Sequence, residues 1–145
     1  MSLKVELKPG ERLIIGACVI TNSDQRTRLT IDGKLPILRE KDILKPDQAD
    51  TPAKLVYLAV QLMYLEGSFQ ASRTEYFSLV NALALGMPES IPILDEINNE
   101  ILTNNLYKAL KASKKLIDLE KEQSRNAESS GAGLSAGGAP NRPPA

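Results

Sequence analysis

The 145-residue sequence contains no histidine. Histidine is the commonest general base and a frequent metal ligand, and it completes the Ser-His and Cys-His pairs of many nucleophilic enzymes. A glycine-rich phosphate loop of the G-x-x-x-x-G-K-S/T type is also missing. We therefore expect a protein that is not an enzyme and uses no metal or cofactor. Catalysis by carboxylates alone or by a Ser-Lys pair stays open in principle.

The sequence has a single cysteine and no long apolar run. Cys18 cannot form an intramolecular disulfide, which fits a reducing compartment. Its neighbours Ala17 and Val19 favour a buried strand position, and a reactive thiol is the alternative. No apolar run approaches the roughly 18 residues of a membrane span, and the first residues lack the layout of a signal peptide. We expect a cytoplasmic protein that does not contact a membrane.

The charges of the chain cancel, with 18 basic and 18 acidic residues. Whole-chain electrostatics therefore cannot attract a nucleic acid, and any RNA site must be a local basic patch. Tryptophan is absent, and the four tyrosines and two phenylalanines fall in segments that we expect to be helical. Base stacking on a sheet is therefore disfavoured, and we expect these aromatic side chains in the core.

Residues 1–48 have the pattern of a small antiparallel β unit. The Lys-Pro-Gly-Glu sequence at 8–11 predicts a type II turn, because proline presets φ at the second position and Gly10 supplies the positive φ of the third. Apolar and charged residues alternate over 3–8, and a short branched run occupies 13–15, so strands should flank the turn.

Further strands are expected later in the same unit. The segment 19–21 predicts one strand, and 26–31 predicts another with a basic face. Asp32-Gly33 predicts the turn that closes a hairpin. Ile37-Leu38, directly after a proline, predicts a last strand or a sheet edge.

Residues 49–122 have the pattern of three helices. The first should be capped by Asp50 or Thr51 and end at Gly67, the second should span about 70–85, and the third about 91–122. The inward residues expected on the second helix are Phe69, Tyr76, Phe77, Val80, Leu83 and Ala84. Residues 123–145 are rich in Gly, Ala, Ser and Pro and predict a disordered tail. The expected fold class is α+β.

The stretch from Lys8 to Gly16 fits the pattern Lys-x-Gly-Glu-x-apolar-x-Ile-Gly. This pattern resembles the opening of the carbon storage regulator family, whose members are small β-sheet dimers that bind messenger RNA leaders. Together with the segments 21–28, 36–44, 49–54 and 59–64, it makes the first 122 residues similar to the FlbT family. That resemblance implies a bacterial post-transcriptional regulator of flagellin synthesis.

The sequence at 38–43, Leu-Arg-Glu-Lys-Asp-Ile, resembles the Val-His-Arg-Glu-Glu-Ile edge strand that supplies the RNA-contacting arginine of the carbon storage regulators. Arg39 takes the matching position, with leucine in place of the histidine and one residue inserted before Ile43. The candidate RNA-binding residues are Arg39, Lys41, Arg26, Arg28, Lys8, Arg12 and Lys4. Acidic residues are interleaved among them, so a solvated sheet face is the alternative.

The helices occupy over half of the chain and need a role of their own. The resemblance implies FlaF, a small helical flagellar protein, as a partner, and a long third helix is suited to pairing with one. The candidate partner-binding residues are Leu106, Leu110, Leu116 and Ile117. Packing inside the chain is the alternative for these side chains. A homodimer is compatible with the resemblance, and the sequence leaves the oligomeric state open.

These observations predict an RNA-binding post-transcriptional regulator. It would bind the 5′ untranslated leader of flagellin mRNA, repress translation and promote decay of the message. The alternative from another functional class is a flagellar chaperone-like protein that holds a helical client through its helices. A chaperone needs an open apolar groove between helices, whereas an RNA regulator needs the basic sheet edge.

Overall fold

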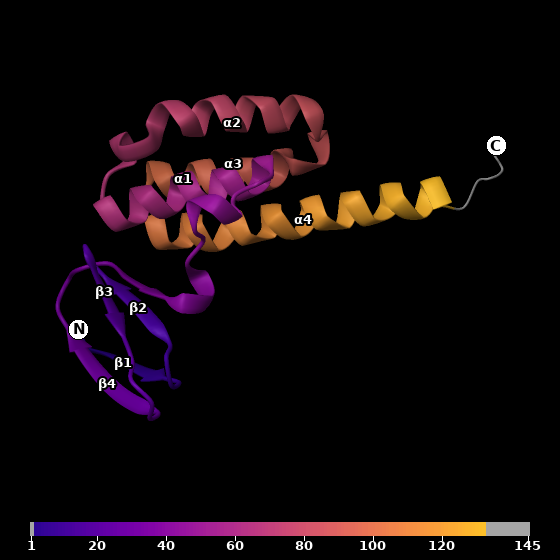
Figure 1. Cartoon of the computed structure of the whole chain (residues 1–145). Helices are drawn as coiled ribbons and strands as arrows, with labels where there is room; N and C mark the ends of the chain where they lie inside the picture. Colours follow the sequence, from indigo (N-terminus) through magenta and orange to yellow (C-terminus); the bar gives the residue numbers. More distant parts are fainter. Residues whose placement is uncertain (1, 133–145) are drawn as a thin grey trace.

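The computed structural model describes residues 2–132, and the side chains of residues 2–127. Within these residues, five strands precede four α-helices (Figure 1). The strands are β1 (Ser2–Leu7), β2 (Arg12–Ile15), β3 (Cys18–Thr21), β4 (Thr27–Asp32) and β5 (Ile37–Arg39). The helices are α1 (Pro52–Glu66), α2 (Arg73–Gly86), α3 (Ile91–Leu102) and α4 (Leu106–Ala132). Short 3-10 helices connect them at η1 (Glu40–Asp42), η2 (Pro46–Gln48), η3 (Phe69–Ser72) and η4 (Pro88–Ser90). This order confirms the predicted α+β class.

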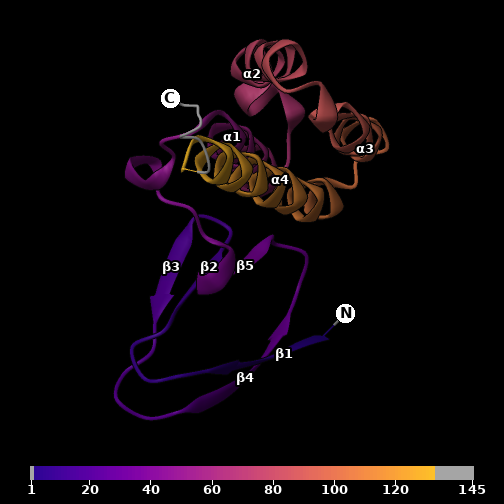
Figure 2. The ribbon, with the colours of Figure 1, turned by 90° about the vertical axis from the view of Figure 1, so that its right-hand side faces the viewer.

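The strands form two small antiparallel sheets that stack beneath the helices. β1 pairs with β4, from Ser2 opposite Asp32 to Leu7 opposite Thr27. The second sheet has the order β3-β2-β5. Figure 2 shows this second sheet between the β1–β4 pair and the helices α1 and α4. The fold therefore has a strand layer with protein on both sides.

Both faces of the central strand β2 pack against other parts of the protein, which explains its run of apolar residues. Leu13 is fully buried and packs against Val5 and Leu7 of β1. Ile14 points the other way and packs against the helical core, which also takes in Leu38 of β5. Successive residues of one strand thus contribute to two different cores.

The predicted turn at 8–11 is confirmed. Gly10 has a φ of +74°, and the amide of Glu11 donates a hydrogen bond of 3.0 Å to the carbonyl of Lys8. The Gly10 amide also donates to the carbonyl of Ser23 at 2.9 Å. The turn therefore anchors the loop that leads into β4. The predicted polarity of β4 is confirmed as well, because its exposed residues alternate with half-buried ones.

Two expectations about the sheets are wrong. Asp32-Gly33 does not close a hairpin, because β4 pairs with β1 and the chain then crosses to the other sheet to form β5. Cys18 is exposed rather than buried. The reason is that β3 lies at the edge of its sheet, where β2 is its one partner among the described strands, and all four of its residues are exposed.

Helix α1 has the predicted boundaries. Thr51 caps it by accepting a hydrogen bond from the amide of Lys54 at 3.3 Å, and Pro52 occupies the first helical position. The helix ends at Gly67, whose φ of +70° gives the left-handed C-cap. Proline at the start and glycine at the end confine the helix to the segment between them.

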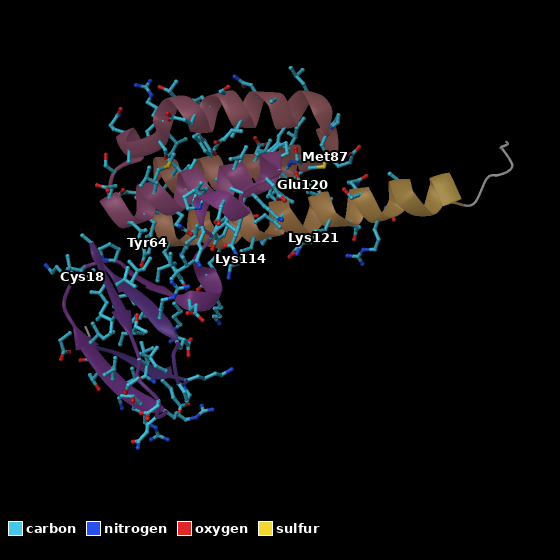
Figure 3. The ribbon with its side chains drawn as sticks, viewed as in Figure 1. Cys18, Tyr64, Met87, Lys114, Glu120 and Lys121 are labelled. Atoms are coloured by element: carbon cyan, nitrogen blue, oxygen red, sulfur yellow. The ribbon has the colours of Figure 1, made fainter. Side chains whose placement is uncertain are left out.

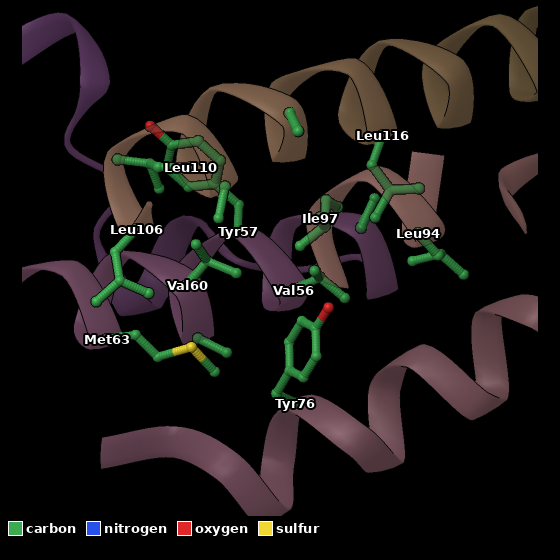
Figure 4. Packing of buried hydrophobic residues seen from close by; sticks show 14 of the residues in the cluster. Val56, Tyr57, Val60, Met63, Tyr76, Leu94, Ile97, Leu106, Leu110 and Leu116 are labelled. Atoms are coloured by element: carbon green, nitrogen blue, oxygen red, sulfur yellow. The ribbon is translucent and has the colours of Figure 1, made fainter. Parts of the chain in front are cut away.

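Helix α1 lies at the centre of the helical core (Figure 4). Its Val56, Val60 and Met63 are completely buried. Leu110 of α4 and Tyr76 of α2 enter the same cluster from the neighbouring helices.

Two aromatic side chains depart from the expected core. Phe77 is 45% exposed and Tyr107 is 41% exposed. Only Tyr76 and Leu83 of α2 are fully buried, so α2 presents a narrow face to the core and leaves Phe77 at its edge. Phe77 instead packs edge-on against Phe69, with ring centroids 5.6 Å apart.

The long third helix predicted over 91–122 is two helices. The chain breaks at Asn104, the one residue other than glycine with positive φ (61°) in the described part of the chain. The amide of Asn105 donates to the carbonyl of Glu100 at 2.7 Å, and the Thr103 hydroxyl donates to the carbonyl of Asn99 at 2.9 Å. Asparagine tolerates the left-handed conformation well, so the Asn104-Asn105 pair allows α4 to fold back along α3.

The predicted helix end at Glu122 is also wrong, because α4 continues to Ala132. It extends past the ends of the other helices (Figure 1). The part of the predicted disordered tail beyond Ala132, residues 133–145, lies outside the described residues.

The turn at Gly10 yields a test of the β unit. Gly10→Ala should lower the free energy of unfolding by about 1–2 kcal/mol, because a Cβ disfavours the left-handed conformation. A Cβ at Gly10 would meet no atom within 4 Å, so the cost is conformational rather than steric. Chemical denaturation measures it. Gly86→Ala is the control, since Gly86 is helical and equally uncrowded and should gain stability. Equal effects of the two substitutions would contradict the turn assignment.

Candidate nucleic-acid interface

Polar side chains of α1 bind the backbone of β5 and the segment after it. The Tyr64 hydroxyl donates to the carbonyl of Ile37 at 2.9 Å and accepts from its amide at 3.1 Å. Gln61 makes the same pair of contacts with Leu44, at 3.0 and 2.8 Å. Burial raises the pKa of Tyr64, so its hydroxyl remains a donor. We call residues 37–44, which run along α1 in this way, the strap.

Asp42 is the buried charge of the strap. Its carboxylate forms an ion pair with Lys114 of α4, and Lys111 lies 3.8 Å from its other oxygen. Only 2% of the Asp42 side chain is exposed. Its backbone carbonyl accepts a hydrogen bond of 2.5 Å from the Tyr57 hydroxyl, whose pKa is raised by burial and by the Asp42 charge. Figure 3 shows Lys114 and Tyr64 at the junction between the sheets and the helices.

Three cations converge on a cleft of about 290 Å³ beside this junction. Arg39 and Lys41 come from the strap, and Lys111 comes from α4. The Tyr107 side chain and the Asp42 carboxylate raise the pKa of Lys111 more than its partial burial lowers it. Asp42 is the acidic residue that lines the cleft, and Lys114 balances its charge. The cleft therefore carries a net positive charge.

The predicted edge strand ends earlier than expected. β5 stops at Arg39, and Lys41 lies in η1 rather than on a strand. The turn of η1 buries Asp42 and leaves Lys41 exposed. Arg39 and Lys41 nevertheless reach the same cleft.

The other candidate RNA-binding residues are not brought to this cleft. Arg26 and Arg28 form ion pairs with Glu6 across the β1–β4 sheet, at 3.5 and 3.9 Å. Arg12 pairs with Glu40 at 3.3 Å. The exposed residues of this group that form no ion pair with a described residue are Lys4 and Lys8. By the same measure, Arg39 and Lys41 are also without an acidic partner.

A family model described as Flagellar protein FlbT matches residues 3–123. The chain belongs to the FlbT family. It is 58% identical over 123 residues to the "Probable flagellum biosynthesis repressor protein FlbT 1" of Bradyrhizobium diazoefficiens, covering 84% of each chain. It is 37% identical over 141 residues to the "Flagellum biosynthesis repressor protein FlbT" of Caulobacter vibrioides, covering 95% of this chain and 98% of the relative. None of the solved structures matches it.

The residues predicted to bind a partner lie largely inside this member of the FlbT family. Leu106, Leu110 and Leu116 are 8%, 1% and 0% exposed and belong to the helical core. Ile117 is partly buried and packs against the same core. The alternative of packing inside the chain therefore describes these side chains, and a partner of α4 would have to contact other residues.

Lys111 is the residue of the cleft that sequence reasoning missed. The signal that was present is the spacing of Lys108, Lys111 and Lys115, which places them near one another on a helix. The spacing does not predict which part of the fold these lysines lie against. The position of Lys111 opposite Arg39 depends on the break at Asn104, which turns α4 back over the strap.

Among the described residues, no group of three or more His, Cys, Asp or Glu side chains is placed to hold a metal ion. None of the helices described is both long and apolar enough to cross a membrane.

The ion pair of Asp42 yields a stability test. Lys114→Met should lower the free energy of unfolding by about 3 kcal/mol, because it leaves a buried carboxylate with one distant partner. Lys115→Met is the control. Lys115 pairs at 2.9 Å with the exposed Glu96, and its loss should cost less than about 1 kcal/mol.

Denaturation curves of the two variants and of Asp42→Asn/Lys114→Met complete this test. The double variant should be more stable than Lys114→Met alone, since it removes the charge that was left buried. If the two lysine variants were equally stable, Asp42 would not be the anchor of the strap.

Proposed function

We propose that this chain regulates flagellum biosynthesis by binding RNA. In this proposal it binds the 5′ untranslated leader of flagellin mRNA, represses translation and promotes decay of the message. The observation that carries the proposal is the convergence of Arg39, Lys41 and Lys111 on one cleft. Its relatives are named as repressors of flagellum biosynthesis, which supports a regulatory role.

The charge arrangement suits RNA even though the whole chain is neutral. Arg26, Arg28 and Arg12 are compensated by nearby carboxylates, whereas Arg39 and Lys41 have no acidic partner among the described residues. A guanidinium can bind a phosphate through two parallel hydrogen bonds, and ammonium groups add point charge. The attraction is thus local to the cleft.

Repression follows from occupancy of the leader. A protein bound near the ribosome-binding region blocks initiation, and a message without ribosomes is exposed to nucleases. No chemical step is required of the protein, which agrees with the absence of histidine from the sequence.

Arg39 is the residue to test. Arg39→Ala should weaken binding of a flagellin leader tenfold to hundredfold, because charge-assisted hydrogen bonds are worth about 1.5–3 kcal/mol. Arg39→Lys should restore only part of the affinity, since it keeps the charge but loses the planar fork. Fluorescence anisotropy with labelled leader RNA measures both.

Two arginines serve as controls for this test. Arg125→Ala removes the same charge from an exposed position on α4 that does not line the cleft, and it should bind like the wild type. Arg28→Ala removes a candidate on the β1–β4 sheet whose side chain is 90% exposed. If Arg28→Ala weakened binding more than Arg39→Ala, the interface would lie on the β1–β4 sheet.

One observation favours the chaperone-like alternative. An apolar groove of about 700 Å³ lies between α1 and α2. Leu55 and Leu62 line it and are 38% and 42% exposed. A groove of this kind accepts the apolar face of an amphipathic helix, which a helical client of a chaperone-like protein would offer. For the regulator, we propose that the same groove binds its partner, a FlaF-like helical flagellar protein.

Leu62→Glu separates the two functions. It should abolish binding of the FlaF protein of the same organism, because it places a charge in the apolar groove. It should leave the affinity for leader RNA unchanged. Leu85→Glu is the control, since Leu85 is 86% exposed on α2 and does not line the groove. Calorimetric titration with FlaF gives the first affinity, and anisotropy gives the second. Loss of RNA binding in Leu62→Glu alone would contradict a separate RNA site.

A further inference from the structure

The cleft of Arg39 continues into a second one. The second cleft has a volume of about 520 Å³ and shares Leu35, Tyr64 and Tyr107 with the first. Its far end carries Lys34, from the loop before β5, and Lys108 of α4. The two clefts form one groove between residues 34–41 and the first turns of α4, with cations at both ends.

We propose that single-stranded RNA lies along this groove, from Lys41 and Arg39 past Tyr107 to Lys34 and Lys108, with one base stacked on the Tyr107 ring. This inference rests on the proposed function and assigns the strandedness of the RNA and the path that it takes. It extends the interface from the cleft of Arg39 and Lys111 to Lys34 and to Tyr107 and Lys108 of α4, a helix for which the sequence predicted only packing and partner contacts.

The charges along the groove favour a polyanion over its whole length. Of the residues that line either cleft, Asp42 alone is acidic, and its carboxylate is buried against Lys114. Lys34 and Lys108 form no ion pair within the described residues. Phosphates at each end of the groove therefore meet ammonium or guanidinium groups that no carboxylate already occupies.

Tyr107 supplies the stacking surface between the cations. It is 41% exposed, and its ring centroid lies 5.5 Å from that of Tyr64. The Lys111 ammonium lies 5.1 Å from the Tyr107 centroid, so it occupies the position over the ring. A base that stacks there takes the place of this ammonium, which then moves to the adjoining phosphate. In the complex the Tyr107 ring therefore stacks on a base and the Lys111 ammonium pairs with a phosphate.

Stacking on Tyr107 requires a single strand. In a duplex each base face is covered by its neighbours in the stack, and the protein reaches only edges, sugars and phosphates. An unpaired strand presents its bases one at a time to an aromatic ring. Asn104, exposed at the Lys108 end of the groove, has an amide that can bind a base edge.

The absence of tryptophan from the sequence makes the stacking directly observable. Tyr107→Trp introduces the single tryptophan of the protein at the proposed stacking position. Titration with a single-stranded flagellin leader should quench its emission, with the same midpoint as the anisotropy curve. Phe77→Trp is the matched control, because Phe77 is 45% exposed on α2 and lines neither cleft. Its emission should not change on the same titration.

Affinity gives an independent measure. Tyr107→Leu should bind the leader about fivefold to hundredfold more weakly, the usual loss on removing one aromatic stack, and Tyr107→Phe should bind like the wild type. Lys34→Ala and Lys108→Ala should each reduce the slope of log affinity against log salt by about 0.7, the value for one phosphate of a single strand. Melting curves establish that each variant is folded.

The outcomes separate this inference from the function on which it rests. If the wild type binds the leader but the Tyr107→Trp emission is unchanged and Tyr107→Leu binds equally well, the groove is not the path and the proposed function stands. If a fully paired leader duplex competes as well as the single strand, the assignment to single-stranded RNA is overturned. If the wild type does not bind the leader at low salt, the proposed function itself fails.

Discussion

The strap, residues 37–44, is held in place by hydrogen bonds and an ion pair of polar groups that are largely shielded from water. Its backbone bonds to Tyr64 and Gln61 of α1, and its one buried carboxylate, Asp42, pairs with Lys114 of α4. A buried carboxylate without a partner would be costly, so the segment is stable only while α4 lies against it. The sheets and the helices are joined by these polar contacts together with Leu38 and Ile14, the strand residues that pack in the helical core.

Uncompensated positive charge also lies at this junction between the sheets and the helices. The arginines of the outer sheet and of β2 are paired with Glu6 or Glu40, so their fields are locally cancelled. At the junction Asp42 is enclosed and matched to Lys114, which leaves Arg39 and Lys41 without a carboxylate among the described residues. A chain with no net charge thus has a positive groove beside the exposed ring of Tyr107.

The sequence correctly predicted one turn and the caps of one helix, whose conformations depend on residues that are adjacent in the chain. The turn at Gly10 and the caps of α1 at Thr51 and Gly67 follow from residues that have few alternatives to the conformations they adopt. The break at Asn104 was missed because the apolar spacing on either side of it is continuous. Strand order was missed because β1 pairs with β4 although β2 and β3, which belong to the other sheet, lie between them in the sequence, and the exposure of Cys18 follows from that order. Arg39 was predicted from the resemblance, whereas Lys111 and Tyr107 line the cleft with it only because α4 folds back.

The two walls of the groove come from widely separated parts of the chain, and the Asp42–Lys114 pair spans 72 positions. During synthesis the β unit leaves the ribosome long before the first turns of α4 exist. A nascent chain can therefore form the Gly10 turn and the β1–β4 pair, but Arg39 and Lys41 are then present without the wall that carries Tyr107. The groove is assembled only when the last helix has emerged and folded back. Under the proposed function, RNA binding therefore begins with a finished molecule, because prematurely terminated fragments without α4 lack one wall of the groove.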